Sequence, residues 1–191
     1  MKKRVKLLTT IASLCLAVAL MAFGVYAAAN VTFTTTSTVS FTATTDVFGT
    51  FEANVKKTGS ADALDTIEAT RANTAGSSWS NTTVTGAGEA LGENLKLEAV
   101  NDEYVFTYKF TNTSPYAVKY TITTTVTADV PTATTADAET VLAIDTTDVT
   151  TKSGTIAIDS FEQWTISVKL LSLDIAADTD ITVNFALALE K

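Results

Sequence analysis

Residues 31–45 read VTFTTTSTVSFTATT, and this stretch carries the pattern that decides the fold. Its apolar side chains fall on alternate positions, so that Val31, Phe33, Val39 and Phe41 share one face of an extended chain while threonines dominate the other. A period of two residues is that of a half-buried β-strand, and β-branched Thr and Val favour strands. The stretch therefore predicts a long strand with one face in a hydrophobic core.

The same alternation recurs along the rest of the chain. Its apolar faces are Val47, Phe51, Ala53 and Val55; Tyr104, Phe106, Tyr108 and Phe110; Tyr116, Val118, Tyr120, Ile122 and Val126; Ile156 and Ile158; Trp164, Ile166, Val168 and Leu170; and Ile181, Val183, Phe185, Leu187 and Leu189. Many short strands with only 2 prolines predict an all-β fold. We expect an antiparallel two-sheet sandwich, jelly-roll-like or Ig-like.

Three local predictions concern how these strands are connected. Residues 95–99 and 104–110 flank the turn residues Asn101 and Asp102, which predicts a β-hairpin. Residues 62–72 place Leu64, Ile67 and Arg71 at helical spacing, so this segment is interpreted as a short helix or a loop crossing. Residues 134–144 are Ala-rich and receive the same interpretation.

The N-terminus has the order of an export signal. Four basic residues within Met1 to Lys6 precede the uncharged apolar stretch from Leu7 to Val25, and Ala27, Ala28 and Ala29 follow. We expect residues 1–27 to be a signal peptide cleaved near residues 27–29, and residues 28–191 to form a single domain. A retained anchor is the alternative, since about 20 apolar residues can span a bilayer. In either case the membrane is contacted only through this segment.

The composition excludes several classes of function. The chain has no His, and its single Cys, Cys15, lies inside the apolar N-terminal stretch, so most hydrolase mechanisms and the usual zinc sites lack their residues. The net charge of −8 becomes about −12 without the signal, a balance that repels nucleic acid. No phosphate-binding glycine motif follows a strand. We therefore expect a secreted, extracellular or cell-surface protein that is not an enzyme.

Two candidate sites remain. Asp174, Asp178 and Asp180 could place carboxylate oxygens around a calcium ion, although their spacing matches no EF-hand and an acidic turn is the plainer interpretation. No other cofactor is expected. Trp79, in a predicted loop, is a candidate contact for a glycan. The segment Asn112-Thr113-Ser114 matches the pattern of an N-glycosylation acceptor. In a Thr-rich chain such short matches arise by chance.

A set of features along the chain resembles the TasA and camelysin family of secreted bacterial matrix and surface-fibre proteins. These features are the Ala-ending export signal, the alternating strand that follows it, the strand exit at Asn112-Thr113-Ser114, and the late strand from Trp164 to Leu170. The resemblance implies a jelly-roll-like sandwich and fibres in which the N-terminal strand of one subunit fills the sheet of its neighbour. The metallopeptidase activity described for camelysin relatives is not carried over, because this chain has no His.

The expected function is a structural subunit of an extracellular fibre, biofilm matrix or surface layer that associates with copies of itself. Residues 31–45 are the candidate assembly strand, because strand addition would use the backbone for affinity and Val31, Phe33, Val39 and Phe41 for register. An ordinary first strand of the same sandwich is the competing interpretation. The alternative function is a monomeric cell-surface adhesin or glycan-binding module.

Overall fold

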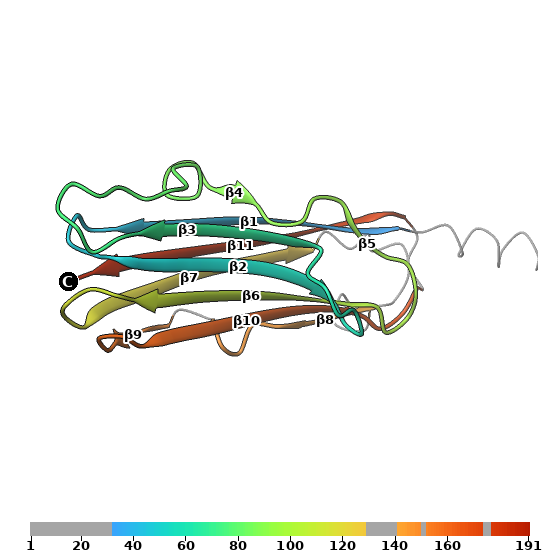
Figure 1. The fold of residues 1–191 in the computed structure, drawn as a ribbon. Coiled ribbons are helices and arrows are strands. Elements are labelled where there is room, and N and C mark those ends of the chain that lie inside the picture. The colour runs from blue at the N-terminus through green and yellow to red at the C-terminus, as the bar shows by residue number, and fades with distance from the viewer. Residues whose placement is uncertain (1–31, 129–140, 150–151, 174–176) are drawn as a thin grey trace, which may run out of the picture.

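The alternating runs of the sequence form β-strands that pair into two facing sheets, as Figure 1 shows for a computed structural model. The structure describes residues 32–128, 141–149, 152–173 and 177–191. The first sheet has the order β4-β1-β11-β7-β9, with β5 also paired to β1. The second sheet has the order β3-β2-β6-β10-β8. The predicted all-β two-sheet sandwich is confirmed.

The first sheet contains the two ends of the described chain. Its strands are β1 (Phe33–Ala43), β4 (Glu89–Ala90), β5 (Leu95–Leu97), β7 (Val118–Ala128), β9 (Ser153–Ile156) and β11 (Thr179–Glu190). The second sheet consists of β2 (Gly49–Lys57), β3 (Asp65–Arg71), β6 (Glu103–Asn112), β8 (Leu142–Asp145) and β10 (Phe161–Leu170).

The core lies between the sheets and is built by the alternation that the sequence shows. The largest fully buried side chains include Trp164, Tyr108, Phe33, Phe41 and Phe185. Tyr108 of β6 stacks on Phe185 of β11, with ring centroids 3.8 Å apart, so the sheets meet through a flat aromatic contact at their centre. Ile158 departs from the prediction, since it is 52% exposed whereas Ile156 is buried.

Among the described strands, one pairing differs in direction from the rest. β1 runs parallel to β11, with Phe33 opposite Thr179 and Ala43 opposite Leu189, whereas the other pairings are antiparallel. The predicted antiparallel sandwich therefore contains a parallel pair formed by its first and last strands. Alternation fixes which face of a strand is buried but not the direction of its neighbour, which is why the sequence did not reveal it.

Two connections differ from the sequence-based predictions. The segment Leu95–Leu97 does not form a hairpin with the strand that follows it: β5 pairs with β1 in the first sheet, whereas β6 pairs with β2 and β10 in the second. The turn at Asn101 thus crosses between the sheets, with Asn101 in a left-handed conformation at φ 74°. The segment 62–72, expected to be a helix or a loop, forms β3, because Ile67 and Ala69 alternate into the core.

The corresponding prediction for residues 134–144 falls partly outside the described residues. Its last residues belong to β8, which pairs with β10 through Leu142 and Ile144. In the part of the chain that the structure describes, no helix has the length and apolar character needed to cross a membrane.

Candidate functional site

The candidate site is the place that β1 occupies in the first sheet. One edge of β1 pairs with β11, and the other edge faces the strap formed by residues 84–97, which contains β4 and β5. The backbone N–H of Phe41 donates to the carbonyl oxygen of Val84 at 3.0 Å, and that of Leu91 donates to the carbonyl oxygen of Ser37 at 2.9 Å. Figure 1 shows β1 beside β11, with β4 on its other side. β1 is therefore held on both edges.

The inward face of β1 is part of the core at both ends of the strand. Phe33, Val39 and Phe41 are at most 1% exposed. The ring of Phe41 lies 4.9 Å from that of Phe51 in the opposite sheet. The predicted assembly residues therefore fill the sandwich; Val31, the fourth of them, lies outside the described residues.

The middle of the same face is polar. Thr35 and Ser37 are completely buried between Phe33 and Val39. Among the described residues, the hydroxyls of both lack a hydrogen-bond partner, as do the Tyr108 hydroxyl, the Trp164 ring nitrogen and the Thr179 hydroxyl. A buried polar group without a partner costs roughly 1–3 kcal/mol. The buried contact between β1 and the core thus combines large apolar side chains with several polar groups that lack a partner among the described residues.

The Tyr108 phenol is buried beside Ser37 of β1. Burial raises the pKa of Tyr108 well above its usual range, and the nearby Ser37 hydroxyl offsets this only partly. The two hydroxyls face one another, but their arrangement falls short of hydrogen-bond geometry. Ser37 is a small residue, and Tyr108 beside it stacks on Phe185. A shift of β1 by two residues would bring a larger side chain to this point, so the small polar residues also specify register.

The two ends of β1 are fixed differently. At its start, the backbone N–H of Thr32 donates to Oδ1 of Asp178 at 2.8 Å, and Thr179 N–H donates to the Thr32 carbonyl at 3.1 Å. At its end, Thr44 N–H donates to the Leu189 carbonyl at 3.1 Å. The link of residues 44–48 then carries the chain to β2 in the opposite sheet. This short link is the covalent connection between β1 and the other described strands.

A buried corner holds the link in place. Ser114 accepts a hydrogen bond from Phe48 N–H at 2.9 Å, and its own N–H donates to Oδ1 of Asn112. The amide nitrogen of Asn112 donates to the carbonyl oxygens of Tyr116, Ile156 and Ala157 at 2.9 to 3.2 Å. Asn112 is completely buried. The Asn112-Thr113-Ser114 match to a glycosylation acceptor is therefore a structural corner in the folded protein, since a buried and fully used amide cannot carry a glycan.

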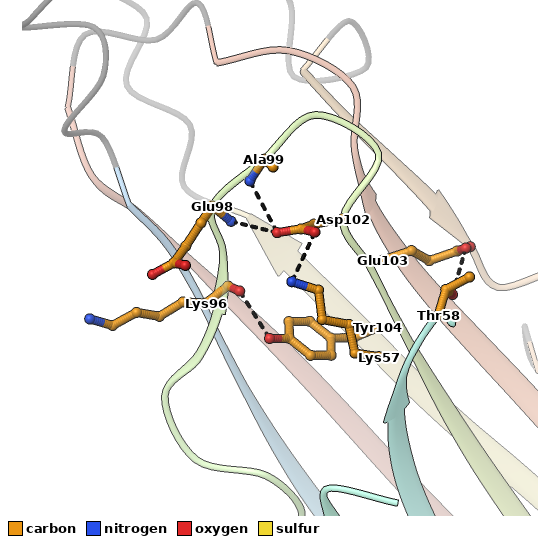
Figure 2. A network of polar contacts seen from close by, with 8 residues as sticks. All are labelled: Lys57, Thr58, Lys96, Glu98, Ala99, Asp102, Glu103 and Tyr104. Atoms are coloured by element: carbon orange, nitrogen blue, oxygen red, sulfur yellow. Dashed lines mark hydrogen bonds and ion pairs between the residues drawn. The ribbon is translucent and has the colours of Figure 1, made fainter. Parts of the chain in front are cut away.

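A polar cluster closes the other end of the sandwich (Figure 2). One carboxylate oxygen of Asp102 accepts hydrogen bonds from Glu98 N–H at 2.9 Å and Ala99 N–H at 3.0 Å, while the other lies 2.8 Å from the Lys57 ammonium. Burial raises the pKa of Asp102, but these donors outweigh it, so the pKa is lowered overall. The hydrogen bond to Asp102 raises the pKa of Lys57. The cluster fixes the turn that carries the chain from β5 to β6.

The acidic residues predicted to bind calcium are not brought together in the described structure. Asp178 accepts the hydrogen bond that begins β1, and Asp180 is exposed on β11 opposite Thr34. Asp174 lies outside the described residues. Within the described ranges, no group of three or more His, Cys, Asp or Glu side chains could hold a metal ion. The calcium hypothesis therefore stays a prediction, with Asp178 already engaged by the backbone.

Trp79 lies at the edge of the core rather than free on a loop. Its ring contacts that of Phe41 edge-on at 4.8 Å and lies 6.4 Å from the ring of Phe110. The side chain is half-buried. Trp79 therefore helps to cover the end of β1, and its role as a glycan contact stays a prediction.

Comparisons with known proteins assign no family to this chain. No protein-family model matches it, and no curated protein matches it. Among solved structures it is similar to a crystal structure of a mutant of the major pilin from Streptococcus pyogenes, with 12% identity and a TM-score of 0.21. That match covers 84% of this chain and 49% of the pilin chain, so the chain spans about half the length of the pilin. The TM-score is too low to support an argument about fold or function.

Proposed function

We propose that this protein is a secreted structural subunit of an extracellular fibre, biofilm matrix or surface layer, and that copies are joined by exchange of the strand β1. The role is non-enzymatic. The observation that carries the proposal is the position of β1. This first described strand supplies Phe33, Val39 and Phe41 to the core, and its covalent connection to the other described strands runs through residues 44–48.

A strand in this position can be replaced by the same strand of another copy. If β1 leaves, a groove opens between β11 and the strap of residues 84–97, lined by core aromatic residues. Loss of these apolar contacts makes the open state unstable, so the groove must be refilled. A second copy offers a segment of identical sequence and therefore identical complementarity. This exchange is strand addition with side chains that specify register.

The chemistry of the buried face favours exchange over permanent closure. The large residues at both ends of β1 supply affinity, whereas the hydroxyls of Thr35 and Ser37 weaken its centre. The strand is then bound strongly enough to hold the fold together but less strongly than an all-apolar strand would be. The lower cost of release makes exchange between copies accessible.

Complementation with a peptide tests the exchange directly. A protein lacking residues 28–45 is expected to be poorly folded alone and to recover cooperative unfolding when a synthetic peptide of residues 31–45 is added. The matched control is the same peptide with Phe33→Asp and Phe41→Asp, which places charge at two buried positions and is expected to give no recovery. Recovery with both peptides, or with neither, would contradict specific seating of β1.

Electron microscopy of exported protein tests the assembled state. Negative-stain images of purified protein are expected to show filaments, and intact-mass measurement is expected to show that residues 1–27 are absent. Closed dimers without filaments would show that exchange occurs but builds no fibre. Monomers at all concentrations would favour the adhesin alternative.

A further inference from the structure

We propose that the outer surface of the first sheet is a lateral contact face between copies of this chain, through which filaments associate side by side. The face consists of four outward side chains from each of three adjacent strands, and we call it the threonine face. Its members are Thr36, Thr38, Ser40 and Thr42 of β1; Thr182, Asn184, Ala186 and Ala188 of β11; and Thr121, Thr123, Thr125 and Thr127 of β7.

The register of the three strands places the outward side chains in regular rows. Thr38, Asn184 and Thr125 stand in one row across the three strands, and the same holds for the rows that begin at Thr36, Ser40 and Thr42. Neighbouring strands are about 4.8 Å apart and successive outward residues about 6.7 Å apart. The result is an array of short hydroxyl-bearing and methyl-bearing side chains, which another flat surface can approach closely.

The absence of charge from this array is the feature that points to a second copy. The chain carries a net charge of −8, and about −12 without its first 27 residues, so two copies repel one another over most approaches. None of the residues of the threonine face is ionisable. The outer surface of the second sheet, in contrast, carries both signs of charge: Glu52, Lys56, Glu68, Lys109 and Lys169. Charged groups must be paired or lose their hydration when two copies meet, so the uncharged threonine face is easier to cover than the charged surface of the second sheet. The charged residues Lys119, Asp180 and Glu190 border the threonine face at the ends of β7 and β11.

Hollows on the threonine face can accommodate threonine side chains of another copy. The small residues Ala186 and Ala188 leave a hollow of about 110 Å³ on β11, flanked by Thr42 of β1 and by Thr121 and Thr123 of β7. A second hollow, of about 200 Å³, continues it past Thr44 and Glu190. Threonine side chains from another copy can enter such a groove. The face presents no aromatic ring for stacking on a sugar, which disfavours a glycan as the occupant.

The small area of the threonine face indicates a weak contact between single molecules. Three strands and four rows cover roughly 400 Å² at the spacings given above. A stable pair of proteins needs about 800 Å² from each partner, so the contact is weak between single molecules. In a filament the contact repeats along the length, and the repeated contacts act together. This inference rests on the proposed fibre role only for bundling, since the weak pairwise contact exists without it.

A pair of charge variants tests the face in filaments. Asn184→Glu with Thr125→Glu places two charges in one row of the threonine face. The matched control is Asn54→Glu with Thr66→Glu, which changes the same residue types at facing positions of β2 and β3 on the other sheet. In negative stain, wild type and the control are expected to form bundles, and the face variant single filaments. Bundles in the face variant, or loss of bundles in both, would overturn the proposal.

A second measurement needs no filaments and separates this inference from the fibre role. In a concentration series of unpolymerised protein, methyl NMR signals of Thr121, Thr123 and Thr125 are expected to shift while that of Thr66 does not. The face variant should weaken this self-association on the order of tenfold, because like charges then oppose one another. Shifts that require added chitohexaose, or shifts spread over both sheets, would overturn the proposal. Absence of filaments together with the expected shifts would remove the fibre role and leave the contact face standing.

Discussion

Replacing Thr35 by Val is expected to stabilise the protein, against the usual direction of core substitutions. Thr35 is completely buried on β1, and its hydroxyl has no partner among the described residues. Valine has nearly the same shape and lacks the hydroxyl, so the substitution removes an uncompensated polar group worth roughly 1–3 kcal/mol. We expect the free energy of unfolding to rise by about 1 kcal/mol and the midpoint temperature by about 2–4 °C.

The same substitution is expected to slow assembly. If β1 must leave its seat before it is exchanged, a gain of about 1 kcal/mol lowers the rate of release about fivefold. Urea unfolding and the growth rate of filaments in light scattering measure the two effects. The control is Thr66→Val on the exposed outer side of β3, away from β1 and from the threonine face, which should change stability by less than about 0.5 kcal/mol. A loss of stability in Thr35→Val would show that the hydroxyl is compensated, and stabilisation without slower growth would refute release of β1.

Three further substitutions test other parts of the structure. Phe41→Ala should lower the free energy of unfolding by about 3–5 kcal/mol in urea, because the ring is buried between the sheets, whereas Ser40→Ala should be nearly neutral. Asn112→Ala leaves three carbonyl oxygens without their donor and should cost about 2–4 kcal/mol in thermal unfolding; a neutral result would remove the corner from the account. Asp102→Asn should flatten the pH dependence of stability. The pKa of Asp102 is lowered in the folded state, so the stability that its carboxylate contributes is present above about pH 4 and is lost as the pH falls. Because the side chain of Lys57 is 38% exposed, this contribution is about 1 kcal/mol or less. A stability curve with the same acid limb in Asp102→Asn as in wild type would contradict the prediction.

Alternation in the sequence was sufficient to predict the fold class and most of the core. Trp164, Phe185 and Phe41 each lie on the apolar side of an alternating run, and each is buried as predicted. The same rule also accounts for β3, where Ile67 and Ala69 alternate over too short a stretch to outweigh an apparent helical spacing. Burial on one face is a local property, so a local pattern can reveal it.

The partners of the strands and the contacts of the buried polar side chains could not be predicted from alternation. The parallel neighbour of β1 is the last strand of the chain, and the partner of β5 is β1 rather than the strand that follows it. Both depend on where distant segments meet. Thr35 and Ser37 lie on the same face of the strand as Phe33 and Val39, so alternation directs them inward, but only the structure shows that both are completely buried and that Ser37 lies beside Tyr108. The acceptor pattern at Asn112 is a local match, whereas two of its three carbonyl partners, Ile156 and Ala157, lie on a distant segment that the pattern cannot reveal.

Cross-linking between two marked copies tests strand exchange most directly. Residues 28–191 contain no Cys, so one variant with Thr36→Cys and a second with Thr182→Cys introduce single thiols at positions that pair between β1 and β11. Filaments grown from an equal mixture are expected to contain a disulfide joining the two variants. A mixture of Thr36→Cys with Ala186→Cys is the control, since these positions lie four residues out of register, about 13 Å apart. Filaments that form without the first disulfide, or that form both disulfides equally, would contradict exchange of β1 between copies.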